Sequence, residues 1–335
     1  MKNKPLVLMF FVFTFTLTST CLYAADKPAS ANLPSIIKTI PIPWPVSGVV
    51  DEKENRVFIL ARDERGSAVF VLNGRDSSII KKISIKEEFF GNIAGNSLAY
   101  NPDTKRLYAL VNLGRGIAVI DAKTYTILDV IKNPRNYRVL SINVSKRNMI
   151  YQVAVGYPYI FEFNGGSNKL KEEIRYGGNG SYSAISEDGN FLYIAGEGNL
   201  LKFDIKAKKA TASLPITLSS ISIPLIDEKN GLIFLASAYK MYVIDLPTFK
   251  TKDEKEDIPF PNTDGASLAL NPTTNHLFVP TYNDSVSVID VPAMKILTTI
   301  KVGQTVRSIA VNSQTNRVYV TLVNYENKVV VIQDR

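Results

Sequence analysis

Few residues of this chain have the chemistry that catalysis or metal binding usually needs. Its 335 residues include one histidine, His276, and one cysteine, Cys21. A single imidazole argues against metal centres built from several histidines and against most histidine-based catalysis. No Cys-x-x-Cys-His motif occurs, which excludes covalently attached haem.

His276 is the residue to test for general-base catalysis. It lies five positions after Asn271, at a repeat position where Arg56, Arg106 and Arg317 stand in equivalent segments. We expect charged residues at this position to be solvated turn residues, away from the usual ligand entrance. The sequence therefore predicts a structural role for His276, and not membership of a Ser-His-Asp triad.

Four aspartates recur at intervals and suggest a carboxylate cluster at first reading. Each one ends an apolar, strand-like segment and begins a polar turn, where an Asx side chain bonds nearby backbone N–H groups. We therefore predict turn caps on separate repeats at Asp121, Asp204, Asp245 and Asp290.

The glycine-rich segment Tyr176–Tyr182 is the remaining candidate for phosphate chemistry. No Lys-Ser or Lys-Thr pair follows it, and no helical pattern begins there. It does not match a P-loop, and we predict a flexible connection between repeats.

Internal repetition is the dominant feature of the sequence. One unit reads as a short apolar strand, a polar turn, an aromatic-rich strand, a polar loop and a strand that ends in Ile-Asp. Three copies are clear, at Leu98–Tyr108, Leu268–Phe278 and Ile309–Tyr319. Weaker copies begin at Val49, Leu140, Ala184 and Ile223.

Two series of residues count the units. The turn after the first strand falls at Asp51, Asn101, Asn143, Ser186, Asp227, Asn271 and Asn312. The third strand ends at Asn73, Asp121, Asn164, Asp204, Asp245, Asp290 and Gln333. Units of about 40–45 residues with four short strands are typical of β-propeller blades. The sequence predicts an all-β fold: a seven-bladed β-propeller with four-stranded antiparallel blades.

The two ends of the repeat region are predicted to close the ring. The last unit has no outer strand, and Ile36–Ile42 precedes the first unit and matches Ile296–Val302, the outer strand of unit six. Pro41 and Pro43 remove donors from one edge, which suits an outer strand. We therefore predict that the N-terminal strand pairs with the C-terminal blade. An insertion at Lys86–Asn96 is expected to be a loop or one helical turn.

In a propeller, the loops between blades and those between second and third strands meet around the channel mouth. Aromatic rings beside guanidinium groups suit an anionic ligand with flat rings, such as single-stranded nucleic acid. The predicted ligand-binding residues are Trp44, Arg62, Arg115, Arg135, Tyr137, Arg138, Tyr157, Tyr182, Tyr239, Tyr282, Arg307 and Tyr325. Acids in the same loops leave a solvated, mixed-charge rim as the alternative: Asp63, Glu64, Glu197, Asp264, Asp284 and Glu326.

A metal-assisted hydrolase of the lactonase kind is the alternative function on this fold. Asn96, Asn179, Asn262 and Asp264 are close enough in the predicted topology to be considered. Nothing in their spacing specifies a metal. We therefore predict no catalytic residue, no metal site and no cofactor, with enzymatic activity left open.

Several motifs resemble one known family. Leu107-Tyr108, Val318–Thr321, Val286–Asp290, Asn271–Asn275 and Ile300–Gly303 are similar to the YVTN repeat of bacterial extracytoplasmic seven-bladed propellers. The resemblance covers all seven units and is strongest in units two, six and seven. It implies the fold and export, and at least one periplasmic relative is associated with DNA binding. It supplies no catalytic residues.

The N-terminus reads as a secretory signal peptide. Lys2 and Lys4 precede an uncharged apolar run at 6–17, and small residues follow up to Ala24. We expect domains at 1–24 (signal peptide), 25–34 (linker) and 35–335 (propeller). A retained membrane anchor and lipidation at Cys21 are the alternatives.

Export defines the expected setting of the mature chain. The full chain has 39 basic and 31 acidic residues, and cleavage after Ala24 removes two lysines and no acid, which leaves a net charge of +6. We expect a periplasmic or secreted binding protein without a stable membrane span. Its partner is a protein, a polyanion or a small molecule, with single-stranded nucleic acid as one candidate.

Overall fold

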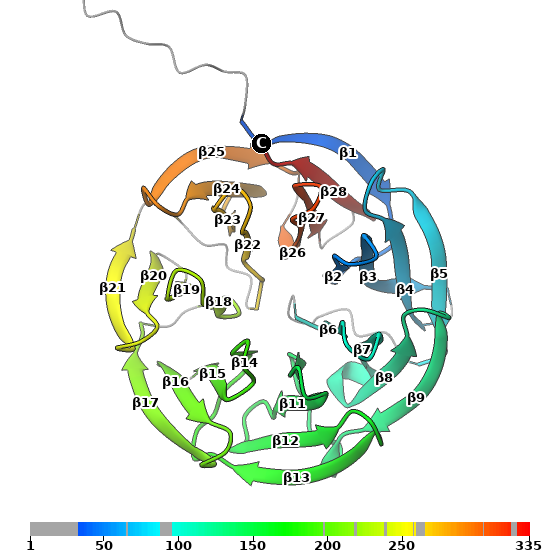
Figure 1. The fold of residues 1–335 in the computed structure, drawn as a ribbon, viewed down its shortest axis with the longest axis vertical. Coiled ribbons are helices and arrows are strands. Elements are labelled where there is room, and N and C mark those ends of the chain that lie inside the picture. The colour runs from blue at the N-terminus through cyan, green and yellow to red at the C-terminus, as the bar shows by residue number, and fades with distance from the viewer. Residues whose placement is uncertain are drawn as a thin grey trace, which may run out of the picture. The chain divides into compact units, whose positions relative to one another are not determined.

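The computed structural model describes residues 33–335 except 65, 88–95, 197, 218–219, 238–239, 257, 259–264, 304 and 323–326. The predicted signal peptide and most of the linker lie outside these residues, as does most of the insertion at Lys86–Asn96. The described residues form seven four-stranded antiparallel sheets around a central axis (Figure 1). The predicted seven-bladed β-propeller is confirmed.

The first four blades follow the chain from the inner to the outer strand. Blade 1 contains β2 (Ser47–Asp51), β3 (Arg56–Asp63), β4 (Gly66–Asn73) and β5 (Ile79–Ile85). Blade 2 contains β6 (Leu98–Asn101), β7 (Arg106–Val111), β8 (Gly116–Asp121) and β9 (Thr126–Lys132). Blade 3 contains β10 (Asn143–Val144), β11 (Met149–Val153), β12 (Tyr159–Asn164) and β13 (Lys169–Arg175). Blade 4 contains β14 (Tyr182–Ile185), β15 (Phe191–Gly196), β16 (Asn199–Asp204) and β17 (Lys209–Pro215).

The last three blades complete the ring. Blade 5 contains β18 (Leu225–Asp227), β19 (Leu232–Ser237), β20 (Lys240–Asp245) and β21 (Lys250–Lys255). Blade 6 contains β22 (Ala269–Asn271), β23 (His276–Thr281), β24 (Ser285–Asp290) and β25 (Lys295–Lys301). Blade 7 contains β26 (Val306–Asn312), β27 (Arg317–Leu322), β28 (Lys328–Gln333) and β1 (Ser35–Pro41). Two short 3-10 turns, η1 (Asn112–Gly114) and η2 (Pro134–Asn136), flank β8 and β9.

Strand position within a blade determines its composition. The second and third strands are covered on both faces by the neighbouring blades, so β7 and β8 are almost entirely buried and apolar. Outer strands such as β9 expose most of their residues to solvent, and in β9 these include the apolar Ile127 and Leu128 beside polar side chains. The predicted ends of all seven third strands, from Asn73 to Gln333, coincide with the observed ends.

The ring closes as predicted. Strand β1 pairs with β28 in antiparallel register, with Ile36 opposite Ile332 and Ile40 opposite Val329. The N–H of Ile42 continues this edge and donates to the carbonyl of Asn327 at 3.0 Å. No helix of the described residues has the length and apolar character that crossing a membrane requires.

Arginines at the start of the second strand connect neighbouring blades. Arg56 Nη1 donates to the carbonyl of Ala122 in blade 2 at 2.8 Å, and Arg106 Nη1 bonds the carbonyl of Gly165 in blade 3. Arg317 crosses in the same way from blade 7 to blade 1. The expectation that these are solvated turn residues was wrong, because the position faces the next blade and each side chain spans the interface.

His276 occupies the same position in blade 6 and also differs from the expectation of a solvated residue. Its Nδ1 lies 2.7 Å from Oδ1 of Asp334 in blade 7, and the two side chains are 13% and 0% exposed. Asp334 also accepts from Asn271 Nδ2 at 2.7 Å. The predicted structural role therefore stands, but its basis is a buried contact between blades 6 and 7.

Candidate functional site

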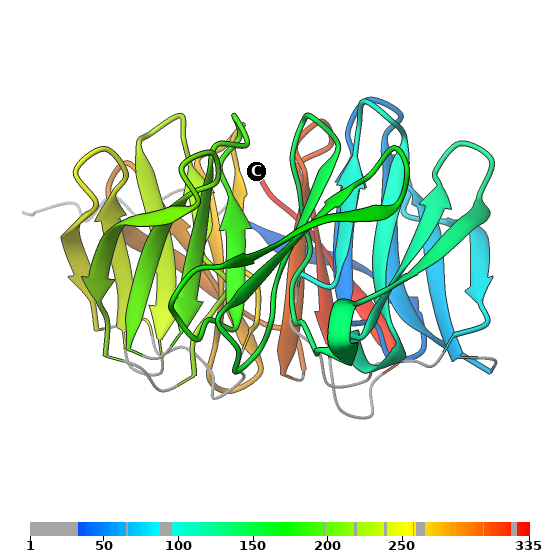
Figure 2. The ribbon, with the colours of Figure 1, turned by 90° about the horizontal axis from the view of Figure 1, so that it is seen from below.

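The loops of the predicted channel mouth lie on one face of the ring. Antiparallel strands alternate in direction, so the β9–β10 connection and the β11–β12 turn lie on one face. The β10–β11 and β12–β13 turns lie on the other. Figure 2 shows the first face downward, with a short helical turn at its lower edge. We call this downward side the channel face.

Four aromatic rings stack on the channel face between blades 2 and 3. The Tyr137 ring lies 4.1 Å from the Tyr157 ring, measured between centroids, at an interplanar angle of 13°. The Tyr137 ring also lies 6.1 Å from the Tyr159 ring and 6.2 Å from the buried ring of Phe161. Tyr157 ends the stack with 45% of its surface exposed. The outermost ring of the stack is thus accessible to a flat ligand.

Arginines surround this stack. The Arg135 guanidinium carbon lies 5.2 Å from the centroid of Tyr159, and its Nη2 lies 3.1 Å from Glu173. Arg138 is exposed beside Tyr137 on the same connection. We call Arg135, Tyr137, Arg138, Tyr157 and Tyr159 the aromatic–arginine cluster. It combines a stacking surface with cations, as a ligand with flat anionic groups requires.

The backbone brings a further arginine close to the cluster. Val139 N–H donates to the carbonyl of Gly114 at 2.9 Å, and Asn133 N–H donates to the carbonyl of Arg115 at 2.9 Å. Exposed Arg115 therefore stands on a segment that is bonded directly to the β9–β10 connection. Three of the predicted arginines, Arg115, Arg135 and Arg138, thus stand on connected segments, and Arg135 pairs with Glu173.

A shallow depression lies on blade 1, apart from the aromatic–arginine cluster. Its volume is about 350 Å³, and Trp44, which is 39% exposed, forms part of its wall. The Asp63 carboxylate there accepts from Ser84 Oγ at 2.6 Å and lies 3.7 Å from Lys82 Nζ. The other residues that line it are Pro43, Arg62, Glu64 and Phe70. This depression has mixed charge, in keeping with the alternative of a solvated rim.

The remaining predicted residues do not join the cluster in one place. Tyr182 is 7% exposed and packs in the hydrophobic core, so its ring does not face a ligand. Tyr282 and Arg307 are half-buried on blades 6 and 7. Tyr239 and Tyr325 lie outside the described residues, as do the acids Glu197, Asp264 and Glu326.

The residues considered for a metal site are only partly described. Asn96 is half-buried and Asn179 is exposed, whereas Asn262 and Asp264 lie outside the described residues. Within the described part of the chain, no three His, Cys, Asp or Glu side chains are grouped closely enough to hold a metal ion.

Sequence reasoning missed two members of the stack. Tyr157, Tyr159 and Phe161 are spaced by two, and alternate residues of a strand lie on one face of the sheet. This alternation was visible in the sequence and places Tyr159 and Phe161 behind Tyr157. Strand periodicity therefore accounts for Tyr159 and Phe161, which lie in β12, whereas Tyr157 stands on the β11–β12 turn.

A ring of serines near the axis was also missed. In blades 1, 2, 6 and 7 a serine stands four positions before the residue of the first turn. Blades 3, 4 and 5 also have a serine near this position, at a different spacing. The Ser141 and Ser183 hydroxyls are 3.1 Å apart, and Ser267 Oγ donates to Ser308 Oγ at 3.2 Å. These bonds connect the inner strands of adjacent blades. The seven are Ser47, Ser97, Ser141, Ser183, Ser222, Ser267 and Ser308.

Solved structures share the fold at low sequence identity. A chain in the crystal structure of the mitotic checkpoint complex aligns with a TM-score of 0.74 and 12% identity, over 97% of this chain and 99% of that one. A chain of hydrazine synthase from Kuenenia stuttgartiensis aligns with a TM-score of 0.71 and 14% identity, over 88% and 96%. The β-propeller domain of Cps50 (Swd1) from Myceliophteria thermophila gives 0.71 and 10%, over 90% and 100%.

These similarities support the propeller fold and nothing finer. No protein-family model matches the chain, and no curated protein matches it. One of the similar structures is itself named as a β-propeller domain, in agreement with the fold described here.

Proposed function

We propose that this chain is an exported propeller of the YVTN type that binds single-stranded nucleic acid through its channel face. The observation that carries the proposal is the aromatic–arginine cluster. It offers the exposed Tyr157 ring as a platform and places Arg135 and Arg138 next to it. Nucleic acid supplies both partners, a flat base for the ring and phosphates for the guanidinium groups.

The energetics favour a strand over a small anion. Stacking of a base on an aromatic side chain is worth about 1–3 kcal/mol, and each additional phosphate contact adds counterion release. Arg135 is paired with Glu173, and Arg115 and Arg138 are exposed near the stack. A positive mature net charge adds long-range attraction for a polyanion.

The proposal of export rests on the sequence of the first 24 residues. Lys2 and Lys4 followed by an apolar run and Ala24 have the arrangement of a cleavable signal. Cleavage after Ala24 removes Cys21, the one cysteine, so the folding stability of the mature chain would not depend on the redox state of the compartment. The periplasm and the medium are both compatible with this composition.

The test is fluorescence anisotropy of a labelled oligothymidylate over a series of salt concentrations. We expect the logarithm of the affinity to fall linearly with the logarithm of salt concentration. Tyr157→Ala should weaken binding about tenfold, as expected for the loss of one stacked base. Arg138→Ala should weaken binding and lower the salt slope by about 0.7.

Arg75→Ala provides the matched control. Arg75 is exposed on the β4–β5 turn, which lies on the opposite face of the ring, and its loss changes the net charge by the same amount as the loss of Arg138. Its affinity should stay close to that of the unaltered protein. Absence of binding at low salt, indifference to salt, or equal losses for Arg75→Ala and Arg138→Ala would each overturn the proposal.

A further inference from the structure

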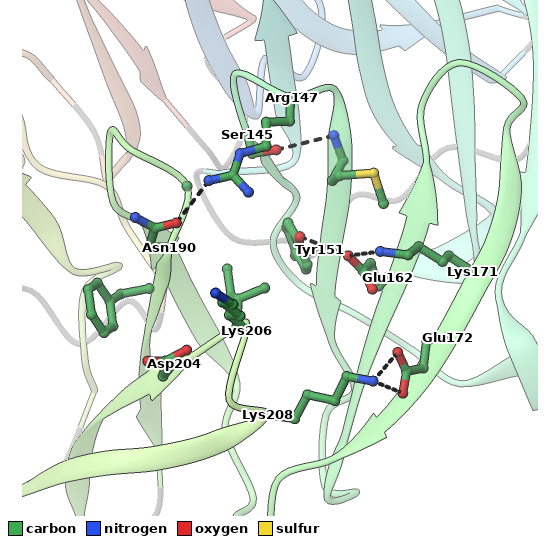
Figure 3. A pocket seen from close by; sticks show the side chains of 14 residues that line it. Ser145, Arg147, Tyr151, Glu162, Lys171, Glu172, Asn190, Asp204, Lys206 and Lys208 are labelled. Atoms are coloured by element: carbon green, nitrogen blue, oxygen red, sulfur yellow. Dashed lines mark hydrogen bonds and ion pairs between the residues drawn. The ribbon is translucent and has the colours of Figure 1, made fainter.

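A cleft opens between blades 3 and 4, on the face opposite the channel face (Figure 3). Its volume is about 880 Å³, within the range of small-molecule sites. One wall comes from β11, β12 and β13 of blade 3, and the other from the β14–β15 and β16–β17 turns of blade 4. Its lining includes Met149, Tyr151, Glu162, Ile205 and Lys206.

The cleft lies where a connection between blades is missing. Arg56 and Arg106 bond the first residue after the third strand of the next blade. In blade 3 that arginine position holds Met149, and the matching residue of blade 4 is Ile205. Neither side chain bridges the interface by hydrogen bonds, and both line the cleft.

Other interfaces without the arginine are filled in a different way. Blade 5 has Leu232 at this position, and it packs with Val291 of blade 6 in one hydrophobic cluster. At the interface between blades 4 and 5, the buried ring of Phe249 lies 6.1 Å from Tyr193. The large cleft at blades 3 and 4 is therefore not a general result of losing the arginine.

A buried carboxylate lies in the wall of the cleft. Glu162 is 5% exposed and stands opposite Tyr151 in the β11–β12 pairing. Five other blades hold valine at the equivalent position, where it packs against the next blade: Val71, Val119, Val243, Val288 and Val331. Burying an ionised carboxylate in an apolar layer is unfavourable unless hydrogen bonds or an opposite charge compensate it. The glutamate in place of valine therefore suggests a function for this position.

The partners of Glu162 all come from its own blade. Tyr151 Oη donates to Glu162 Oε1 at 3.0 Å, and Lys171 Nζ lies 3.1 Å from the same oxygen. Burial and the neighbouring carboxylate raise the pKa of Tyr151, so its hydroxyl remains a donor. Among the described residues both bonds go to Oε1, which leaves Oε2 for a donor that enters the cleft.

Polar contacts hold the two ends of the cleft. At one end Arg147 Nη2 donates to Asn190 Oδ1 at 3.0 Å, and at the other Lys208 Nζ lies 2.6 Å from Glu172 Oε1. Figure 3 shows these contacts above and below the space between the walls. Both contacts join blade 3 to blade 4 across the cleft.

The wall that faces Glu162 is positive. Exposed Lys206 stands on the β16–β17 turn, and it makes no ion pair within the described part of the chain. Asp204 on the same turn accepts from the backbone N–H of Ala207 at 2.8 Å. Arg147, on the β10–β11 turn of blade 3, adds a second cation at the end of the cleft, where it bonds Asn190 and interacts electrostatically with Asp188.

We propose that this cleft binds a small, hydrophilic carboxylic acid that also carries N–H or O–H donors. Its donor group bonds Glu162 Oε2, and its carboxylate meets Lys206 on the facing wall and Arg147 at the end of the cleft. Met149 and Ile205 pack against its carbon skeleton. A hydroxylated sugar acid and a short peptide both have this chemistry.

The test is isothermal titration calorimetry with two probes, glucuronate for hydroxyl donors and alanyl-alanine for an ammonium donor. Glucose, which lacks the carboxylate, and acetate, which lacks the donors, are the ligand controls. At least one probe should bind at millimolar concentration or below, and both controls should bind at least about tenfold more weakly. Binding of glucuronate alone identifies a sugar acid, and binding of the dipeptide alone identifies a peptide.

Two variants locate the binding. Glu162→Val restores the residue of five other blades, and Lys206→Ala removes the facing cation. Each should raise the dissociation constant about tenfold, equivalent to about 1.4 kcal/mol. Lys209→Ala, at an exposed position outside the cleft, should leave it unchanged. Failure of both probes, or binding that Glu162→Val and Lys206→Ala leave intact, would overturn the inference without touching the proposal for the channel face.

Discussion

Replacing Arg56 with methionine tests whether the connections between blades stabilise the ring. Arg56 Nη1 bonds the carbonyl of Ala122 at 2.8 Å and Tyr125 Oη at 3.0 Å, and its Nη2 lies 2.9 Å from Asp51 Oδ2. The two charged side chains are 14% and 1% exposed. Methionine is the residue of blade 3 at this position, and it keeps the apolar stem that packs between blades.

The expected loss is about 3 kcal/mol in the free energy of unfolding. Removing one partner of a buried pair costs about 3–5 kcal/mol when the other charge is left alone. Asp51 keeps a hydrogen bond from Tyr100 at 2.7 Å and lies 3.9 Å from Lys105 Nζ, which places the loss at the low end.

The loss should also depend on pH. Burial acts to raise the pKa of Asp51, but hydrogen bonds from Tyr100 and Arg56 outweigh it and hold the pKa below the ordinary value of 3.8. A lowered pKa in the folded state gives stability that is present above 3.8 and is lost as pH falls through the folded-state value. The deficit of Arg56→Met should therefore be largest near neutral pH and should shrink below about pH 4.

Urea denaturation followed by Trp44 fluorescence and by circular dichroism measures both effects. Arg75→Met, at an exposed position, is the control and should change the free energy of unfolding by less than about 0.5 kcal/mol. An unchanged midpoint for Arg56→Met, or a deficit of equal size at neutral pH and at pH 3, would refute the reasoning.

Four further outcomes are expected. Ile42→Ala removes a fully buried side chain beside the closing strand and should cost about 3 kcal/mol in urea denaturation. Asp51→Asn should flatten the loss of stability in acid, measured as the unfolding midpoint against pH. Glu162→Val should leave the thermal midpoint unchanged or raise it, because it removes a carboxylate from an apolar layer while its partner Lys171 is exposed and stays solvated. Mass spectrometry of the exported protein should give an N-terminus at Ala25.

The architecture was predictable because each blade repeats the same physical pattern. Asx or serine residues follow the first strand, and a polar residue ends the third, so the spacing alone counts seven blades. Prolines at 41 and 43 indicated an outer strand, and the pairing of Ile36 with Ile332 confirms it. These are local signals that every unit carries, and their repetition makes the prediction secure.

The candidate site was predicted less completely. Arg135, Tyr137, Arg138 and Tyr157 stand on two loops that the topology brings to one face, and their stacking follows from that placement. Tyr182 lies in the core because it begins β14 and its side chain packs under the neighbouring blades, which the sequence did not distinguish from a loop position.

The cleft between blades 3 and 4 was not predicted for a different reason. It arises from the absence of a bond, at Met149, together with a carboxylate in an apolar layer, at Glu162. Neither residue is unusual in isolation. Both residues stand out only when the sequences of the seven blades are aligned and each residue is compared with the residues at the equivalent position in the other blades.

The pairing of β1 with β28 also has a consequence for how the protein reaches its native state. The contact between Ile36 and Ile332 joins residues almost 300 positions apart, which makes it among the most non-local contacts in the chain. Because synthesis proceeds from the N-terminus, the early blades can assemble while β1 is still unpaired, since its partner β28 has not yet been made. Until synthesis is nearly finished, the unpaired edge of that strand and the side chain of Ile40, which the closed ring buries, stay accessible to chaperones and proteases.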